Sequence, residues 1–383
     1  MIGSKPVICF ILVFVFFFST AMPVSGSSPG VSARSYCLMD KGSGKIICEG
    51  NSSERLPMAS TTKIMTALLV IRNYDVDKLI SIPSEAVGVE GSSIYLSKGE
   101  KLSVKELLYA LMLESANDAA VALAVGLEGS VEAFCKKMNA LAGEIGMSDT
   151  VFKNPHGLPC EGHYSTARDM ALLMCEAMNE SLFCTISSCE KARISAVEAQ
   201  SYRYLSNHNR LLDKYEYCIG GKTGFTKAAG RCLVTAAKKS DAELVCVTLS
   251  AHDDWNDHIS LFEYGFSLFS KAELCREKEL EYELCVVGGI EDSVKVTNRK
   301  ALFASLLSSD GISVEVELPR FVYAPVKYYP SDGIGEPLAV GRAVYYQNGR
   351  VIGSCELYVC DAVGRYEPPS LWERILRFFG FIK

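Results

Sequence analysis

A serine and a lysine lie three positions apart in the segment Ser60-Thr-Thr-Lys63. At the start of a helix this spacing puts both side chains on one face, with the hydroxyl one turn ahead of the amine. The helix N-terminus favours a serine oxygen that must become an alkoxide, and burial can lower the pKa of a lysine until it accepts a proton. The pair therefore predicts a nucleophile and its base, although an N-cap serine beside a surface lysine has the same spacing.

Two further segments, Ser115-Ala-Asn117 and Lys222-Thr-Gly224, carry polar side chains that could share a cleft with the first pair. Ser115 and Asn117 follow an apolar helical stripe, where an ordinary asparagine C-cap is the alternative. In a strand, Lys222 and Gly224 share one face, and the missing side chain of Gly224 lets a substrate backbone approach. Lys222 and Thr223 would donate hydrogen bonds to a carboxylate, and an ordinary turn is the alternative for this segment.

The apolar periodicity of the surrounding sequence predicts the elements that would position these segments. A β-hairpin is expected over 33–40 and 45–49, and strands over 231–237 and 243–250. Helices are expected over 57–74, 104–114, 118–127, 130–145, 165–178 and 254–271. This order predicts an α+β domain, with one antiparallel sheet flanked by helices and a mostly helical lobe inserted in the middle.

The pattern changes after Leu274, where short strand-like runs are bounded by Gly, Pro, Asn and Asp. Apolar and polar residues alternate strictly from Ile312 to Leu318, as in a half-buried strand. We therefore expect a small C-terminal all-β domain, with strands over 280–287, 312–318, 322–329, 339–347 and 350–359.

Both ends of the chain are strongly apolar. The uninterrupted apolar run Val7–Phe18 is too short for a hydrocarbon core of about 30 Å and is typical of a secretory signal peptide, with an uncleaved anchor as the alternative. At the other end, the segment 371–383 presents a Leu, Trp and Phe face opposite Arg374 and Arg377. This pattern favours a helix that lies in a membrane interface over one that docks on its own domain.

The composition excludes several classes of partner. The chain has 383 residues, a formal net charge of −6 and no block of Lys or Arg, so nucleic acid is not expected to bind. The five histidines are scattered, and CxxC and HExxH motifs are absent, so no metal or other cofactor is expected. Among the cysteines, only Cys37 and Cys48 would face each other across the predicted hairpin and could form a disulfide.

The three polar segments, in this order and in these elements, resemble the motif set of serine penicillin-recognising enzymes. From about Ala33 to Val359 the sequence resembles the low-molecular-mass penicillin-binding proteins of the D-alanyl-D-alanine carboxypeptidase family. The supporting stretches are Met58–Thr66, Glu114–Ala120, Asn154–Leu158, Gly162–Ala171 and Gly220–Thr226. The resemblance implies a penicillin-binding transpeptidase-like fold, a peptidoglycan stem peptide ending in D-Ala-D-Ala as substrate, and β-lactams as covalent inhibitors.

The resemblance also implies roles for individual residues. Ser60 would be the acylated nucleophile, Lys63 would take its proton, and Ser115 would relay a proton to the leaving amine. Asn117 would hold the peptide amide of the substrate. The terminal carboxylate and the oxyanion would be bound on the strand by Lys222, Thr223, Gly224 and Phe225, the last through its backbone N–H together with that of Ser60. His156 and His163 are expected to be hydrogen-bonded loop residues, because Lys63 already fills the role of base.

Other functions use the same motifs. A β-lactamase would need a deacylating glutamate, and Glu161 and Glu176 are the nearby candidates, although neither stands in the expected Glu-x-x-x-Asn pattern. A non-catalytic penicillin-binding wall module is a second alternative. Transpeptidase or endopeptidase action on cross-links shares the chemistry of the carboxypeptidase.

The expected organisation is a signal peptide over 1–26, a catalytic domain over 31–272, a β-rich domain over 275–362 and an amphipathic membrane-associating tail over 368–383. Such a protein would be exported and would act at the outer face of the cytoplasmic membrane, in the cell wall.

Overall fold

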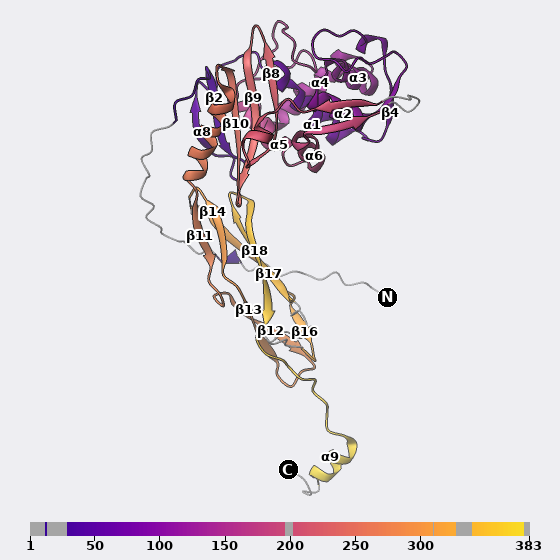
Figure 1. Cartoon of the computed structure of the whole chain (residues 1–383). Helices are drawn as coiled ribbons and strands as arrows, with labels where there is room; N and C mark the ends of the chain where they lie inside the picture. The colour runs from indigo at the N-terminus through magenta and orange to yellow at the C-terminus, as the bar shows by residue number, and fades with distance from the viewer. Residues whose placement is uncertain (1–11, 14–28, 196–201, 309, 327–338, 379–383) are drawn as a thin grey trace. The chain divides into compact units, whose positions relative to one another are not determined.

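The computed structural model of the protein describes residues 12–13, 29–195, 202–308, 310–326 and 339–378. The chain forms two compact units, which we name the α+β unit (Pro23–Phe269) and the β unit (Ser270–Lys383 with Met1–Met22). Figure 1 shows the helices gathered in the α+β unit and mostly strands in the β unit. Most of the expected signal peptide lies outside the described residues. No helix within those residues combines the length and the apolar character needed to cross a membrane.

An antiparallel five-stranded sheet organises the α+β unit, in the order β3-β2-β10-β9-β8. β2 and β3 form the predicted hairpin, and β8 is the edge strand that carries Lys222 and Gly224. The strands are β2 (Ser35–Asp40), β3 (Ile46–Gly50), β8 (Cys218–Thr226), β9 (Gly230–Lys239) and β10 (Ala242–Ala251). Short two-stranded ribbons complete the unit: β4 (Leu79–Ser81) with β5 (Lys101–Ser103), and β6 (Lys191–Ile194) with β7 (Arg203–Ser206).

Helices cover both faces of this sheet, as predicted. On one face α8 (Asp254–Ser267) buries Leu261 and Phe262 against sheet residues such as Leu244. The other face packs on α5 (Ala167–Ala177) and, through it, on α1 (Lys63–Asn73) in the larger core. Helices α6 (Ser181–Ser188) and α7 (Leu211–Lys214) lead toward the edge strand β8.

The inserted lobe consists mainly of α2 (Val104–Leu113), α3 (Asn117–Glu128) and α4 (Val131–Ile145). Ser103 and Glu106 form a reciprocal capping box that fixes the start of α2. Gly129 and Gly146 end α3 and α4 in the left-handed conformation that favours glycine. The lobe confirms the predicted helices to within one residue at each end.

The β unit contains a seven-stranded sheet in the order β1-β15-β17-β18-β13-β12-β16. Its core is apolar and includes Val296, Ala343 and Leu357, all fully buried. The strands are β1 (Leu12–Val13), β12 (Glu281–Val287), β13 (Ser293–Asn298), β15 (Ile312–Glu317), β16 (Phe321–Tyr323), β17 (Gly341–Gln347) and β18 (Arg350–Val359). A separate ribbon pairs β11 (Ser270–Cys275) with β14 (Leu302–Leu306), and α9 (Leu371–Phe378) lies in the expected tail.

The structure corrects four sequence-based expectations. The helix expected over 254–271 ends at Ser267, because the chain enters strand β11 at Ser270. The segment 57–74 is not one helix, since a short 3-10 turn, η1 (Ala59–Thr62), precedes α1. The strand expected over 322–329 ends at Tyr323 among the described residues, and 327–329 lie outside them. Several elements were not predicted: strands β4, β5, β6, β7, β11, β13 and β14 and helices α6 and α7.

The structure does not contain the disulfide that Cys37 and Cys48 could have formed across the hairpin. In the hairpin register Cys37 lies opposite Glu49 and Cys48 lies opposite Leu38, so the two side chains emerge on opposite faces of the ribbon. Both thiols are free, and the Cys48 thiol lies 3.9 Å from the Tyr36 hydroxyl instead. A shift of one residue in register therefore decides the chemistry of this pair.

Candidate active site

The ammonium group of Lys63 is fully buried and surrounded by oxygen atoms. Its Nζ lies 2.9 Å from Ser60 Oγ, 2.7 Å from Asn117 Oδ1 and 2.7 Å from the backbone oxygen of His156. Ser60 lies in η1 and Lys63 begins α1, so the two side chains meet over a single turn. The structure thus brings the predicted nucleophile and base into direct contact.

Burial lowers the pKa of Lys63 well below its usual value, because an ammonium loses its hydration in the protein interior. The positive charge of Lys222 lowers this pKa further, and the carboxylate of Asp118 opposes the change. A lysine with a depressed pKa populates the neutral amine that can accept the proton of a neighbouring hydroxyl. A neutral Lys63 amine would lie within hydrogen-bond distance of the Ser60 hydroxyl whose proton it would accept.

Ser115 and Asn117 are positioned by the junction between α2 and α3. Ser115 has a φ of 58°, a left-handed conformation that is rare for a residue other than glycine and that turns the chain sharply. Asn117 begins α3, and its Nδ2 donates to the backbone oxygen of Glu90 at 2.7 Å while its Oδ1 accepts from Lys63. These two bonds fix the orientation of the Asn117 carboxamide.

The loop beside Asn117 is held by a buried carboxylate. Asp118 accepts hydrogen bonds from the Ser93 hydroxyl and from the backbone N–H groups of Ile94 and Leu96. The backbone N–H of Asn117 in turn donates to the oxygen of Ser92 at 2.7 Å. Asp118 therefore fixes one wall of the cleft against the start of α3.

Edge strand β8 supplies the opposite wall. Lys222 is buried, its Nζ donates to the backbone oxygen of Thr223 at 3.1 Å, and burial lowers its pKa to about 7. A Cβ added at Gly224 would lie 3.0 Å from the backbone nitrogen of Ser60, so glycine lets β8 approach η1 this closely. Phe225, the next residue, is two-thirds exposed.

A cleft of about 440 Å³ opens over these residues. Ser60, Ser115, Thr223, Gly224 and Phe225 line it, and the buried Lys63, Asn117 and Lys222 lie beneath or beside it. The cleft has a second set of lining residues, which the sequence motifs did not indicate: Ser92, His208, Arg210, Arg231, Asp254 and Trp255.

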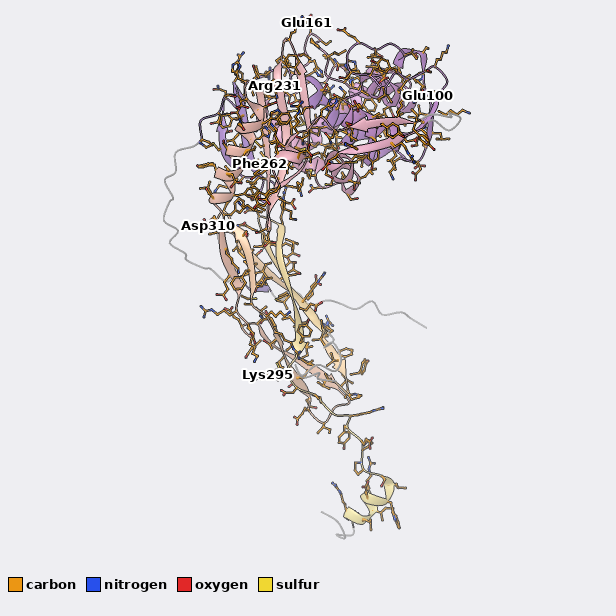
Figure 2. All side chains as sticks on the ribbon, viewed as in Figure 1. Glu100, Glu161, Arg231, Phe262, Lys295 and Asp310 are labelled. Carbon is orange, nitrogen blue, oxygen red and sulfur yellow. The ribbon has the colours of Figure 1, made fainter. Side chains whose placement is uncertain are left out.

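Arg231 connects the cleft rim to α8, as it lies in β9 opposite Phe225. Its Nε and Nη2 both donate to Oδ1 of the buried Asp254, at 2.9 and 2.6 Å, and its guanidinium lies over the Trp255 ring. Figure 2 labels Arg231 among the side chains of this unit. No sequence signal marked Asp254 or Trp255, because their approach to the cleft depends on how α8 packs on the sheet.

The two candidate histidines are hydrogen-bonded loop residues, as expected. His163 Nε2 lies 3.0 Å from the Thr62 hydroxyl, and its Nδ1 accepts from the backbone N–H of Lys153. His156 contributes its backbone oxygen to Lys63, while its Nδ1 accepts from the N–H of Leu158. Burial lowers the pKa of His156 to about 3 and of His163 to about 4, so both are neutral at pH 7.

The two candidate deacylating glutamates do not line the cleft. Glu176 lies on α5 in an ion pair with Arg72 at 2.8 Å. Glu161, labelled in Figure 2, is an exposed residue of a turn. Neither carboxylate lines the cleft at Ser60, so neither of the two candidate glutamates supports the β-lactamase alternative.

The sheet, the η1–α1 junction and the edge strand together define the fold of penicillin-binding DD-peptidases. Penicillin binding protein 5 from Haemophilus influenzae superposes with a TM-score of 0.61 and 27% identity, covering 89% of this chain and all of that one. A D-alanyl-D-alanine carboxypeptidase from Mycobacterium tuberculosis has the same TM-score at 28% identity, covering 64% of this chain and 96% of its own. The predicted fold class is thus confirmed.

The family model described as D-alanyl-D-alanine carboxypeptidase matches residues 22–253, and the chain belongs to that family. It is 32% identical to D-alanyl-D-alanine carboxypeptidase DacF of Bacillus subtilis over 308 residues, 77% of this chain and 78% of the relative. With DacC of Escherichia coli it shares 36% identity over 259 residues, 63% of each chain. The protein is a serine-type D-Ala-D-Ala carboxypeptidase of the penicillin-binding class, a hydrolase of cell-wall peptidoglycan.

Proposed function

We propose that Ser60 carries the acyl group during removal of the terminal D-alanine from peptidoglycan stem pentapeptides, with Lys63 as its base. The observation that supports this proposal is the 2.9 Å contact between Lys63 Nζ and Ser60 Oγ at a fully buried lysine of depressed pKa. Neutral Lys63 takes the hydroxyl proton as Oγ attacks the carbonyl carbon of the penultimate D-alanine.

The developing oxyanion would be bound by the backbone N–H groups of Ser60 and Phe225. Each such donor is typically worth about 10²–10³ in rate. Gly224 lets β8 approach the Ser60 nitrogen closely, so that the N–H of Ser60 in η1 and that of Phe225 in β8 could both donate to one oxygen atom. The substrate then adds to the free edge of β8 as an extra strand.

Collapse of the tetrahedral intermediate breaks the carbon–nitrogen bond to the terminal D-alanine. The leaving nitrogen needs the proton that Lys63 holds, and Ser115, which lines the cleft, relays it. Lys222 and Thr223 bind the terminal carboxylate, and Asn117 holds the peptide amide. Water then hydrolyses the ester at Ser60 and restores the hydroxyl, so each cycle consumes one water and releases one D-alanine.

The test combines two measurements on the same protein. Release of D-alanine from diacetyl-L-lysyl-D-alanyl-D-alanine reports the whole cycle, and labelling by a fluorescent penicillin reports acylation alone. Ser60→Ala should abolish both signals, while Ser188→Ala, at an exposed serine of α6, should retain both. D-alanine release that survives in Ser60→Ala would refute the proposed role of Ser60.

We further propose that the protein is exported, with residues 1–26 as its signal peptide, and that its tail holds it at the membrane surface. No residue of α9 is buried, and Leu371, Trp372 and Phe378 are all more than two-thirds exposed. Their apolar face lies opposite Arg374 and Arg377, the arrangement typical of helices that lie in a bilayer interface. Deleting 371–383 should release the protein from membranes and leave carboxypeptidase activity intact, and retention in the membrane fraction would contradict this role.

A further inference from the structure

A group of exposed apolar side chains lies at one end of the seven-stranded sheet in the β unit. β16 is its edge strand, and it pairs in parallel with β12 so that Phe321 lies opposite Cys285 and Tyr323 opposite Val287. Paired residues point to the same face, so Val287, Phe321 and Tyr323 share the outer face of the sheet. The rings of Phe321 and Tyr323 contact each other edge to face, with centroids 5.3 Å apart.

Two further residues extend this surface. The backbone N–H of Ile290 donates to the oxygen of Gly364 at 2.9 Å, and that of Tyr366 donates to the oxygen of Gly288 at 2.9 Å. These bonds join the turn after β12 to the segment that leads out of the unit. We name Val287, Ile290, Phe321, Tyr323 and Tyr366 the tip patch, and every member is more than two-fifths exposed.

The clustering is uneven across the unit. Outside α9, the other large apolar side chains that are exposed among the described residues of the β unit are Phe303 and Val351. Exposing a cluster of apolar side chains to water is unfavourable, and such a cluster is typical of a binding surface. Tyr323 and Tyr366 in the patch have rings that end in a hydroxyl, and the exposed Arg320 and Arg365 directly precede Phe321 and Tyr366 in the sequence. Tyrosine rings and arginines together suit the boundary between lipid headgroups and acyl chains.

The position of the patch along the chain indicates what covers it. Tyr366 is five residues before Leu371, the first residue of α9, so the connecting chain spans at most about 18 Å. Pro368 and Pro369 lie in this connection and stiffen it. When α9 lies in a bilayer interface, Tyr366 of the tip patch is therefore held within about 18 Å of the start of that helix, close to the bilayer surface.

From these observations we propose that the tip patch is a second membrane-contacting surface, which inserts its aromatic rings into the lipid headgroup region beside α9. The proposal rests on the membrane role of the tail proposed above. Two separate contacts from one unit would fix the orientation of the β unit at the bilayer, whereas the tail alone would leave it free to rotate about the connecting segment. The contact is apolar, so its contribution should persist at high salt, unlike that of Arg374 and Arg377.

Vesicles of equal parts phosphatidylcholine and phosphatidylglycerol provide the binding test on the full chain. The double variant Phe321→Ser/Tyr323→Ser should partition to these vesicles about tenfold more weakly than the parent, at low and at high salt. The matched control Phe303→Ser/Val351→Ser removes two exposed apolar residues elsewhere on the same unit and should change partition less than about twofold. Thermal unfolding of both variants checks that the β unit remains folded.

A tryptophan placed in the tip patch can show whether the patch itself contacts lipid, which a change in vesicle affinity alone cannot show. In a chain with Trp372→Phe, Tyr323→Trp should show a blue-shifted emission on vesicle binding and quenching by brominated phosphatidylcholine, whereas Phe303→Trp should show neither. The signal of Trp255 is common to both and is subtracted with the Trp372→Phe parent.

The outcomes distinguish the tip patch from the tail. If the parent binds vesicles and Tyr323→Trp shows neither a blue shift nor quenching by the brominated lipid, the tip proposal is wrong and the tail proposal stands. If deleting 371–383 leaves binding that Phe321→Ser/Tyr323→Ser then removes, the tail proposal is wrong, and the tip patch contacts the membrane without the second contact that we propose. If the parent does not bind vesicles, both are wrong, and self-association that disappears in the double variant would assign the patch to a second copy of the chain.

Discussion

The α+β unit and the β unit differ in the side chains that they bury. The α+β unit encloses lysines, aspartates, asparagines and histidines, including Lys63, Asp118, Lys222 and His258. In the β unit, Thr297 and Asn298 are the buried polar residues among those described, and the core is otherwise made of Val, Leu, Ala, Cys and Tyr. Among the described residues, the α+β unit buries charged side chains, whereas the β unit buries none, and most exposed large apolar residues of the β unit outside α9 lie in the tip patch.

Buried polar groups lower stability unless each has a partner, so their concentration in one unit needs a functional reason. Around Lys63 the proposed reason is chemical, because the burial that disfavours the ammonium favours the neutral amine that the proposed mechanism uses as a base. No charged side chain is buried among the described residues of the β unit, and the feature of this unit that suggests a role is the exposed tip patch. The candidate site places the chemistry in the first unit, and the proposed membrane contact would give the second unit a role in positioning.

The largest effect should follow from removing the buried amine. Lys63→Met keeps the approximate length of the side chain and leaves Ser60 without its base, so penicillin acylation should fall by about 10³-fold. Stopped-flow labelling with a fluorescent penicillin measures this rate. Lys239→Met, which removes a half-exposed lysine of β9, is the control and should acylate normally. A Lys63→Met protein that acylates at the parent rate would refute the proposal that buried Lys63 is the base for Ser60.

A smaller but still large loss should result from pushing β8 away from η1. In Gly224→Val the branched side chain meets the backbone around Ser60, and misplacement of about 1 Å should lower kcat/KM about a hundredfold. Gly143→Val, at a glycine of α4 with open space around it, is the matched control. Equal activity of the two variants would show that the close approach of β8 is not needed.

The pH dependence should reveal the second buried lysine. Burial lowers the pKa of Lys222 to about 7, so the free enzyme loses the ammonium as pH rises through that value. The kcat/KM for a tripeptide with a free terminal carboxylate should therefore fall on the alkaline side of about pH 7. The same tripeptide with a C-terminal carboxamide has no charge to bind, and its much slower turnover should lack this fall. An identical alkaline limb for both would assign the titration to another group.

The smallest effect on catalysis should come from damage to the β unit. Leu357 is fully buried in its core, so Leu357→Ala should destabilise that unit by about 2–5 kcal/mol. At a temperature where the variant remains folded, D-alanine release should stay within about twofold of the parent. Calorimetry reports the stability and the tripeptide assay the activity, and a parallel loss of both would break the division of roles between the units.

The element types were largely predictable from the sequence. The apolar stripe of α2 and its Ser103 cap, and the glycines that end α3 and α4, act over one or two turns, so their signals lie close together in the chain. The end of α8 was not predictable, because Phe269 continues the apolar helical spacing of Phe262 and Phe266, whereas the chain from Ser270 onward pairs with β14. Pairing partners far away in sequence outweigh local propensity there.

The sequence alone determined which residue types stand at the site. The three-residue spacing brings Ser60 and Lys63 together over a single turn, and Gly224 has no side chain that would keep another segment away from β8. Tertiary structure alone decided that Asn117 and the backbone of His156 both meet the Lys63 amine, that Lys222 is buried, and that Cys37 and Cys48 never face each other. The physical reason is range: spacing within an element follows from backbone geometry, whereas pKa values and strand register depend on atoms that folding brings together from distant parts of the chain.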